Sequence, residues 1–323
     1  MRIVIALGGN ALLRRGEALS ADNQRENIRR AADVLAPLAN DHSVIITHGN
    51  GPQVGLLALQ GEACQPGESW PLDVLDAQTE GMIGYMIEQE LSNRRTDNQR
   101  TATLLTQIIV DPADPAFQNP DKPIGPVYDA AEAATLTSER GWDLRPDGDH
   151  FRRVVPSPQP QDILELDVIK LLVDHGITVI CAGGGGIPVV RHKDGNLTGV
   201  EAVIDKDRTS ALLARALAAD AFLMLTDVEA VFTEWNRPAA RAIHQASPAM
   251  LASLSFAAGS MGPKVEAACD FVVRTGAEAG IGRLQDAALI LEGKAGTIIT
   301  RDLSEICYQD QVRSWSDGAD LDP

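Results

Sequence analysis

The first fifty residues constrain the fold most, because a strand, a glycine turn and a helical segment are followed by a second strand and a second glycine turn. Residues 2–7 are an apolar run of strand length that ends at the Gly-Gly-Asn turn 8–10. Residues 43–47 are a second β-type run that ends at the turn 48–52. Strands that alternate with helices are typical of a parallel sheet covered on both faces. We therefore expect an α/β fold, a three-layer αβα sandwich around a large, mostly parallel sheet.

The segment between these two strands has the period of a helix with one apolar face. Its apolar residues recur at steps of three and four: Ile28, Ala31, Ala32, Leu35, Leu38 and Ala39. Further strands are expected at residues 102–110, 177–182, 221–225 and 287–291. The length of 323 residues fits either one large α/β domain or two lobes that share a sheet.

Residues 111–160 differ in composition from the rest of the chain, because they hold nine of its 18 prolines. Proline fixes φ and removes a backbone donor, so this stretch is not an ordinary crossover helix. Its apolar residues are sufficient for a small ordered unit: Ile124, Val127, Trp142, Phe151, Val154 and Val155. We expect a small protruding subdomain or lid here rather than a disordered linker.

Charge and cysteine usage exclude several classes of partner. The formal net charge of −17 argues against nucleic acid and against an anionic membrane, since both require a broad basic face. The four cysteines lie far apart with no C-x-x-C pair, which fits neither a zinc site nor a disulfide framework. No apolar run reaches the roughly 18 residues of a membrane helix. We expect a cytoplasmic protein.

The two glycine turns are candidate anion sites, because both follow strands of one parallel sheet and ligands bind along the carboxyl edge of such sheets. The residues concerned are Gly8, Gly9 and Asn10 in the first turn and Gly49, Asn50 and Gly51 in the second. A single turn of this kind is often no more than a tight turn, whereas two at one edge favour a ligand. Neither turn reads G-x-G-x-x-G or G-x-x-x-x-G-K-[ST], so any phosphate is bound in another way.

A run of four glycines at residues 183–186 follows the expected strand 177–182. Four glycines carry a large entropic penalty and no side chains, which indicates that something approaches the backbone closely. A flexible loop is the alternative, but the apolar residues that follow at 187–190 favour the close approach.

The lysines are the most informative residues, because the chain has only six of them against 22 arginines. Lys206 lies between Asp205 and Asp207 at a strand-to-helix junction, held by these carboxylates or simply part of a solvated charge cluster. Lys264 opens a helix, where a cation opposes the helix dipole unless an anion lies at that end, such as a bound phosphate. Lys122 lies on a proline-stiffened loop and either reaches into a cleft or is an ordinary exposed lysine.

Together these segments resemble the amino-acid kinase superfamily, and within it the carbamate kinases, from Ile3 to about Thr300. The matching stretches are IALGGNAL, HGNGPQVG, PLDVLDAQTEGMIGY, DPADPAFQNPDKPIGP, RRVVPSPQP, GGGGIPVV, GVEAVIDKD, GSMGPKVEAA and GTIIT. The resemblance implies one kinase-like domain over residues 1–323. It implies an acceptor lobe at 1–110 plus 161–200, a protruding subdomain or lid at 111–160, and a nucleotide lobe at 201–323.

The resemblance also implies reversible phosphoryl transfer between ATP and carbamate, giving ADP and carbamoyl phosphate. Lys206 and Lys264 then neutralise the transferring phosphoryl group, Asp207 holds these lysines, and Lys122 reaches over carbamate. Charge stabilisation and alignment suffice for this chemistry, so we expect neither a phosphoenzyme nor a histidine nucleophile, and His48 has a structural role.

The residues that the resemblance assigns to the acceptor are Gly8, Gly9, Asn10, Gly49, Asn50 and Gly51. Those it assigns to the nucleotide are Gly184, Gly185, Asp205, Thr226, Asp227, Val228, Ser260 and Met261. It further implies Mg²⁺ bound with ATP or ADP, without identifying protein ligands for the metal. Finally, the resemblance implies a homodimer. It also implies ATP synthesis from carbamoyl phosphate in catabolism, as in arginine metabolism.

Three departures from the family pattern and three alternatives stay open. Phe151 stands where the family usually has tryptophan, Ala258 stands where it usually has proline, and the nucleotide-side segment 233–238 is individual to this chain. These affect substrate tuning and base contacts more than the class of reaction. The alternatives are another amino-acid kinase with a different small carboxylate acceptor, a carbamate-kinase-like paralogue, and a ligand-sensing subunit without turnover. The acidic tail at 314–323 is expected to be a solvated or frayed end without a role.

Overall fold

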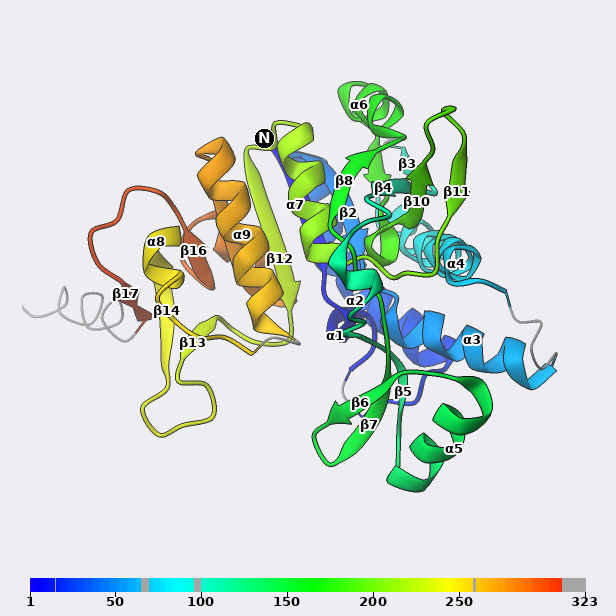
Figure 1. Cartoon of the computed structure of the whole chain (residues 1–323). Coiled ribbons are helices and arrows are strands. Elements are labelled where there is room, and N and C mark those ends of the chain that lie inside the picture. The colour runs from blue at the N-terminus through cyan, green and yellow to red at the C-terminus, as the bar shows by residue number, and fades with distance from the viewer. Residues whose placement is uncertain (15, 65–69, 96–99, 258–259, 310–323) are drawn as a thin grey trace, which may run out of the picture.

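The computed structural model describes residues 1–14, 16–64, 70–95, 100–257 and 260–309, with only the backbone of Asn10 and Ala11. The tail at 314–323 lies outside these residues. Within them a ten-stranded sheet forms the middle of the molecule (Figure 1). Its strands are, in spatial order, β13 (Val231–Thr233), β14 (Arg241–Ala246), β16 (Thr297–Ile299), β15 (Glu278–Arg283), β12 (Ala221–Thr226), β1 (Arg2–Leu7), β2 (Ser43–His48), β9 (Thr178–Ile180) and β3 (Thr101–Thr103), with β17 (Cys307–Tyr308) paired to β14.

The run from β15 through β12, β1, β2 and β9 to β3 is parallel throughout, and antiparallel pairs occur only toward the β13 end of the described sheet. The helices are α1 (Gly9–Leu12), α2 (Ala21–Asp41), α3 (Gly51–Cys64), α4 (Leu72–Ser92), α5 (Ala130–Arg140), α6 (Leu166–Asp174), α7 (Lys206–Ala216), α8 (Pro248–Leu251), α9 (Met261–Thr275) and α10 (Ala287–Leu291). Three short 3-10 turns join them: η1 (Pro115–Phe117), η2 (Gly183–Gly185) and η3 (Leu284–Asp286).

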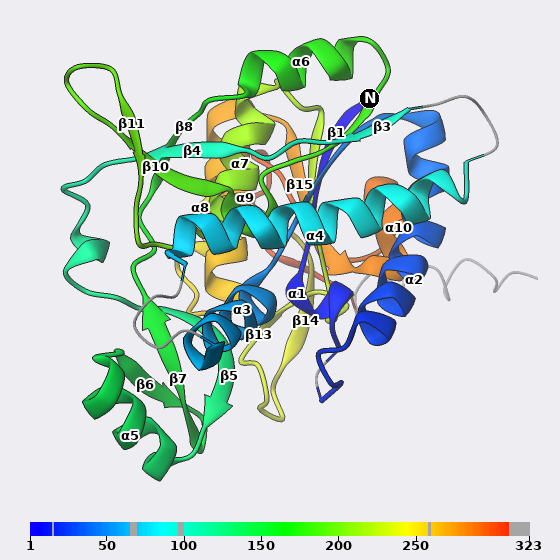
Figure 2. The same cartoon turned by 90° about the vertical axis from the view of Figure 1, so that its right-hand side faces the viewer.

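Alternate residues of β1 face two different cores, which makes the fold a three-layer sandwich. Ile3, Ile5 and Leu7 pack with α2, α4 and α10 on one face of the sheet. Val4 and Ala6 pack with α6, α7 and α9 on the other face. Figure 1 shows α7 and α9 side by side, and Figure 2 shows α2 beside α4. The predicted α/β sandwich around a mostly parallel sheet is confirmed.

Helix α2 shows how local sequence sets an element. The Ser20 hydroxyl accepts a hydrogen bond from the backbone N–H of Asn23 at 3.2 Å and so caps the first turn. All six apolar residues that predicted this helix are buried against the sheet. The predicted helix is confirmed, and so are the strands expected at 2–7, 43–47, 177–182 and 221–225.

The strand expected at 102–110 is wrong as a single element. The chain leaves the central sheet after β3 and enters a second sheet as β4 (Gln107–Val110). Thr106 makes the break: its N–H donates to Glu80 Oε2 at 3.1 Å, and its hydroxyl donates to the Leu104 carbonyl at 2.9 Å. The second sheet has the order β11 (Leu197–Gly199), β10 (Ile187–Arg191), β4 and β8 (Pro160–Ile163).

The strand expected at 287–291 is also wrong, because these residues form α10. The true strand is the preceding β15, whose glycines at 280 and 282 interrupt the apolar pattern that marks a strand. Ile290 of α10 packs on this strand, and a Cβ at Gly280 would lie 2.4 Å from its Cγ2 atom. Glycine in the strand therefore makes room for the helix, and the apolar run belongs to the helix.

Residues 122–155, called the excursion below, form a third sheet that projects from the body together with α5 (Figure 1). Its strands have the order β5 (Lys122–Tyr128), β7 (His150–Val155) and β6 (Leu144–Asp147). Asp129 and Glu132 form a capping box on α5, which ends at Gly141 in the left-handed region. The excursion contacts the body through Gly125, against which Gly55 of α3 packs so closely that a Cβ on Gly55 would lie 2.0 Å from the Gly125 Cα.

Two further expectations concern the chain as a whole. The cysteines at 64, 181, 269 and 307 are all in the described part of the chain, and all are free thiols. Among the described residues no helix combines the length and the apolar character that crossing a bilayer requires.

Candidate active site

Three strand ends meet at one edge of the central sheet. Leu7 of β1 lies opposite both His48 of β2 and Leu225 of β12, so the turns that follow these strands are neighbours. The N–H of Gly8 donates to the Leu225 carbonyl at 2.7 Å. A Cβ on Gly8 would lie 2.9 Å from that oxygen, so only glycine permits this approach. The predicted placement of both glycine turns at one sheet edge is confirmed.

The start of α7 carries a charged run at the same edge. Asp205 caps the helix, because its Oδ1 accepts from the backbone N–H of Asp207 at 2.9 Å and of Arg208 at 3.3 Å. Lys206 turns its ammonium to Asp207 and donates to Oδ1 at 2.6 Å. The Lys206 stem passes over Gly49, where a Cβ would lie 3.5 Å from the lysine Cδ and Cε atoms.

Lys264 reaches the same carboxylate from the first turn of α9. Its Nζ donates to Asp207 Oδ2 at 2.9 Å, so Asp207 accepts one lysine on each oxygen. A cation at a helix N-terminus is unfavourable without an anion nearby. In this protein the anion at that end is Asp207, supplied by the neighbouring helix α7.

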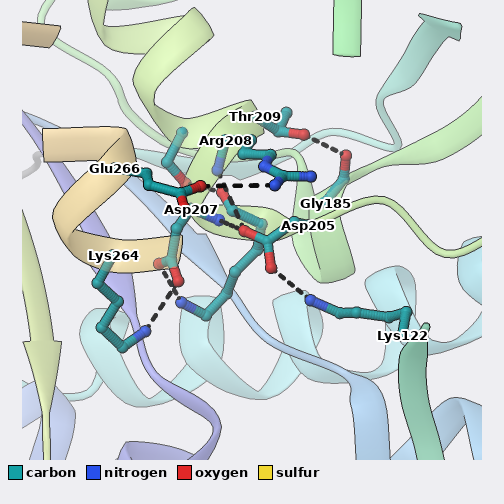
Figure 3. A network of polar contacts seen from close by, with 10 residues as sticks. Lys122, Gly185, Asp205, Asp207, Arg208, Thr209, Lys264 and Glu266 are labelled. Carbon is teal, nitrogen blue, oxygen red and sulfur yellow. Dashed lines mark hydrogen bonds and ion pairs between the residues drawn. The ribbon is translucent and has the colours of Figure 1, made fainter. Parts of the chain in front are cut away.

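Lys122, the first residue of β5 on the excursion, reaches into the body and donates to Asp205 Oδ2. Figure 3 shows Lys264 and Lys122 approaching the two aspartates from opposite sides. The Lys122 side chain is only 28% exposed, which argues against an ordinary surface lysine. Segments separated by 83 and 57 residues thus bring three lysines together on two carboxylates.

The charges of this cluster support one another. Burial alone would raise the pKa of Asp207, but Lys206 and Lys264 hold it well below the ordinary value. Burial also opposes the charged form of Asp205, yet the attraction of Lys122 lowers its pKa. Burial lowers the pKa of Lys206 to about 8, with Lys264 adding to the effect and Asp207 opposing it. For Lys264 the attraction of Asp207 outweighs burial and raises the pKa.

A cleft of about 420 Å³ opens over this cluster, within the size range of small-molecule sites. The predicted site residues that line it are Gly8, Gly9, Lys122, Asp205, Lys206, Asp207, Thr226, Asp227, Val228, Ser260, Met261 and Lys264. The lysines and aspartates of the cluster therefore form part of the lining of the cleft. An apolar part of the lining, called the apolar wall below, comes from Val228, Ala230, Phe232, Trp235 and Phe256.

The remaining predicted residues lie beneath or beside the cleft instead of lining it, namely Gly49, Asn50, Gly51, Gly184 and Gly185. The close approach expected at the four glycines is present, with other parts of the protein as partners. A Cβ on Gly184 would lie 2.2 Å from the Asn50 amide nitrogen, and one on Gly185 would lie 2.4 Å from the Ile204 carbonyl. The side chain of Asn10 is outside the described part of the structure.

A layer of buried polar groups under the second glycine turn was missed by the sequence analysis. The Asn50 amide nitrogen donates to Asp76 Oδ1 and to Thr79 Oγ1, both at 2.9 Å. Burial raises the pKa of Asp76 well above its ordinary value. The signal was present in the stretch PLDVLDAQTEGMIGY, since acidic residues four apart face the same side of a helix.

Glu80 and His48 belong to the same layer. Glu80 accepts from the N–H of Gly183 at 2.8 Å and of Thr106 at 3.1 Å, and burial raises its pKa to about 8. Burial lowers the pKa of His48 to about 4, and its ring packs against Gly183. His48 therefore supports the glycine run as a neutral side chain, in agreement with the structural role expected for it.

Several residues that line the cleft were not predicted as site residues, among them Arg152, Ser157, Phe232 and Trp235. Arg152 of β7 and Ser157 line the cleft beside the excursion, and the buried Ser157 hydroxyl has no hydrogen-bond partner among the described residues. Phe232 and Trp235 pack edge to face with ring centroids 5.0 Å apart. The first pair lies within the quoted stretch RRVVPSPQP, and Trp235 lies in the nucleotide-side segment 233–238, whereas no local pattern marks Phe232 as part of a site.

The described residues contain no group of three or more His, Cys, Asp and Glu side chains arranged to hold a metal ion. Mg²⁺ commonly keeps several waters and binds through substrate phosphates plus one or two carboxylates. The donors in the cleft fit an ion that arrives with a nucleotide.

A parallel sheet with glycine turns, lysines and an apolar wall at its carboxyl edge defines a site for phosphoryl transfer. The chain belongs to the amino acid kinase family, whose model matches residues 1–282. It is similar over nearly its whole length to carbamate kinases.

The carbamate kinase of Rhizobium meliloti is 56% identical over 314 residues, which cover 97% of each chain. That of Haemophilus influenzae is 56% identical over 308 residues, covering 95% of this chain and 99% of its own. Carbamate kinase from Giardia lamblia bound to AMP-PNP is a similar solved structure, with a TM-score of 0.85 and 41% identity over 93% of this chain and 98% of that one.

Proposed function

We propose that this protein is a carbamate kinase, which transfers a phosphoryl group reversibly between ATP and carbamate and gives ADP and carbamoyl phosphate. The observation that carries the proposal is the convergence of Lys122, Lys206 and Lys264 on Asp205 and Asp207 in one cleft. Three ammonium groups against two carboxylates leave the cluster cationic at neutral pH. Such a cluster suits a transition state whose charge is spread over phosphoryl oxygens.

The roles follow from position. Lys206 and Lys264 stabilise the charge of the phosphoryl group in flight, and Asp207 holds both ammonium groups in place. The backbone N–H groups of Gly9 and Asn10 in the first glycine turn face the acceptor, and the excursion places Lys122 over it. No side chain needs to form a bond to phosphorus, because positioning and charge stabilisation supply the catalysis.

The nucleotide lies in the same cleft, with its base against the apolar wall at Phe232 and Trp235. Asp227 lines the cleft and would be the carboxylate that holds Mg²⁺, which would neutralise charge on the nucleotide phosphates. The buried layer under Asn50 fixes the second glycine turn from below. We further propose that the protein works in the cytoplasm as a homodimer and makes ATP from carbamoyl phosphate in catabolism.

The direct test is ATP formation from ADP, Mg²⁺ and carbamoyl phosphate, followed by luciferase luminescence and corrected for the spontaneous decay of carbamoyl phosphate. We expect ATP formation that depends on the enzyme, at micromolar to millimolar concentrations of carbamoyl phosphate. Acetyl phosphate in place of carbamoyl phosphate tests the choice of acceptor. ADP binding without ATP formation from either donor would instead support the sensing subunit.

A further inference from the structure

Asp205 uses its two oxygens for two different parts of the molecule. Oδ1 caps α7 through the backbone N–H groups of Asp207 and Arg208. Oδ2 accepts from Lys122, which lies 83 residues earlier on the excursion. One carboxylate therefore joins the excursion to the helix that presents Lys206 and Asp207 (Figure 3).

Loss of the Lys122 contact would leave Asp205 in an unfavourable state. The Asp205 carboxylate is buried, and the neighbouring anion of Asp207 repels it. Removing the cationic partner of a buried carboxylate is strongly destabilising, because it leaves an uncompensated charge away from water. The contact between Lys122 and Asp205 is therefore expected to persist when the cleft fills.

The geometry leaves Lys122 able to act on a ligand while it stays paired. An ammonium has three N–H donors, and the contact with Asp205 uses one of them. Lys122 lines the cleft together with its neighbours Asp121 and Pro123. Its remaining donors are available to an anion in that cleft.

We propose that Asp205 is a positioning residue that holds the Lys122 ammonium over the acceptor end of the cleft and thereby sets the affinity for carbamoyl phosphate. This inference rests on the proposed function, and it differs from the nucleotide role that resemblance assigned to Asp205. In this scheme Asp205 acts on the acceptor through Lys122 and on the phosphoryl group only by aligning α7.

Two substitutions at Asp205 separate the capping role of Oδ1 from the contact of Oδ2 with Lys122. Asp205→Asn and Asp205→Ser both keep a side-chain oxygen that caps α7, since Asn and Ser are good N-cap residues. Neither keeps the charged Oδ2 that holds Lys122. Asp147→Asn is the matched control, because it breaks an ion pair of the excursion that does not involve Lys122, Arg152 to Asp147 at 2.9 Å, and leaves Lys122 in place.

The experiment measures kcat and KM for carbamoyl phosphate and for ADP in the full-length protein. For Asp205→Asn we expect KM for carbamoyl phosphate to rise about tenfold, the factor that about 1.4 kcal/mol produces. The KM for ADP should stay at the parent value, and kcat should change much less than KM for carbamoyl phosphate. Asp147→Asn should match the parent in all these constants.

A double-mutant cycle shows whether Asp205 acts through Lys122. In a Lys122→Ala background, Asp205→Asn should add no further rise in KM for carbamoyl phosphate. Hydrogen exchange gives a readout without turnover: amides of β5 and β7 should exchange faster in Asp205→Asn than in Asp147→Asn. If Asp205→Asn does not fold, the same comparisons are made with Asp205→Ser and with Lys122→Gln.

The opposite result has a clear meaning. If the contact is a latch that substrate must open, Asp205→Asn will lower KM for carbamoyl phosphate, and the inference is overturned. An unchanged KM, or full additivity in the cycle, also overturns it. A parent protein that makes no ATP from carbamoyl phosphate would refute the proposed function itself, whereas an active parent with unaltered variants refutes only this inference.

Discussion

Lys264 donates to Asp207 Oδ2 at 2.9 Å, although 57 residues separate the two in sequence. The contact spans the packed helices α7 and α9, and both side chains are largely buried. The lysine is therefore held before any substrate arrives. Preorganised charge of this kind needs no reorganisation during the reaction, which is the main source of electrostatic catalysis.

Replacement of Lys264 tests this preorganisation. Lys264→Ala should lower kcat by about 10²–10³, as the loss of one transition-state donor does elsewhere. The KM for carbamoyl phosphate should change little, because the interaction is strongest in the transition state. Steady-state ATP formation measures both constants. Lys294→Ala is the matched control, since Lys294 pairs with Glu292 at the surface, and a similar loss of activity in both variants would contradict the assignment.

The pKa of Lys206 predicts an alkaline limit of activity. Burial lowers that pKa to about 8, with Lys264 contributing, so Lys206 loses its proton as the pH rises through that value. The ratio kcat/KM, which reports the free enzyme, should therefore fall above about pH 8. A pH series with blanks for carbamoyl phosphate decay measures it. The variant Glu80→Gln should keep this alkaline fall in kcat/KM. Loss of the fall in that variant would assign it to Glu80 instead of Lys206.

Glu80 predicts a pH dependence of stability. Its pKa is raised from 4.5 in the unfolded chain to about 8 in the folded protein, chiefly by burial. Between these values the folded state binds a proton that the unfolded state has lost, so the free energy of unfolding falls as the pH rises. The slope from Glu80 is at most about 1.4 kcal/mol per pH unit.

Urea unfolding at pH 7 and pH 8 measures this slope. His48 affects stability mainly below this window, because its pKa is 6.5 in the unfolded chain and about 4 in the folded protein. Lys206, with a pKa of about 8, is present in the parent and in Glu80→Gln alike, so its effect cancels in the comparison. Glu80→Gln should be less stable than the parent, because its amide nitrogen cannot accept from Thr106, but it should lose less stability between the two pH values. Equal slopes for both proteins would show that Glu80 is already ionised at pH 7.

The close packing of Gly55 against Gly125 predicts that the contact between α3 and β5 affects the affinity for carbamoyl phosphate. A Cβ at this position would lie 2.0 Å from the Gly125 Cα, so Gly55→Ala must push β5 away from α3. We expect a loss of about 1–3 kcal/mol in stability, typical of overpacking, and a raised KM for carbamoyl phosphate because Lys122 begins β5. Thermal unfolding and steady-state kinetics measure these effects.

Gly81→Ala is the control for Gly55→Ala. Gly81 is also inside a helix, but its Cβ would make only an ordinary contact, at 3.8 Å from Leu105 Cδ2. Alanine should therefore stabilise α4 by about 0.5–1 kcal/mol. If both variants behave alike, the contact between Gly55 and Gly125 does not set the position of the excursion.

Local sequence was sufficient for the central elements of the fold. The strands β1 and β2 end at glycine turns that place them at one sheet edge, and α2 has a clear apolar face. Prediction from local sequence failed where tertiary contacts override the pattern of a local apolar run. Residues 102–110 read as one strand, but Thr106 bonds to buried Glu80 and the chain changes sheet there.

Rarity and position at turns and helix starts singled out the three lysines that the structure brings together, although only the family resemblance favoured Lys122 over an ordinary exposed lysine. Their partners were less predictable. Sequence neighbours suggested that both flanking aspartates hold Lys206, whereas Lys206 pairs with Asp207 and Asp205 pairs with Lys122. The pairing of Asp205 with Lys122 depends on how the excursion folds against α7, and no local sequence pattern encodes it.

The central position of β1 has a consequence for synthesis of the chain. Its first neighbour, β2, follows within fifty residues, but its other neighbour is β12, which is complete only at Thr226. Until then a growing chain on the ribosome carries an apolar strand with one open edge, the kind of edge that pairs wrongly with other chains. A product truncated before Ala221 is expected to aggregate, so chaperone protection is needed most during translation of the first two thirds of the message.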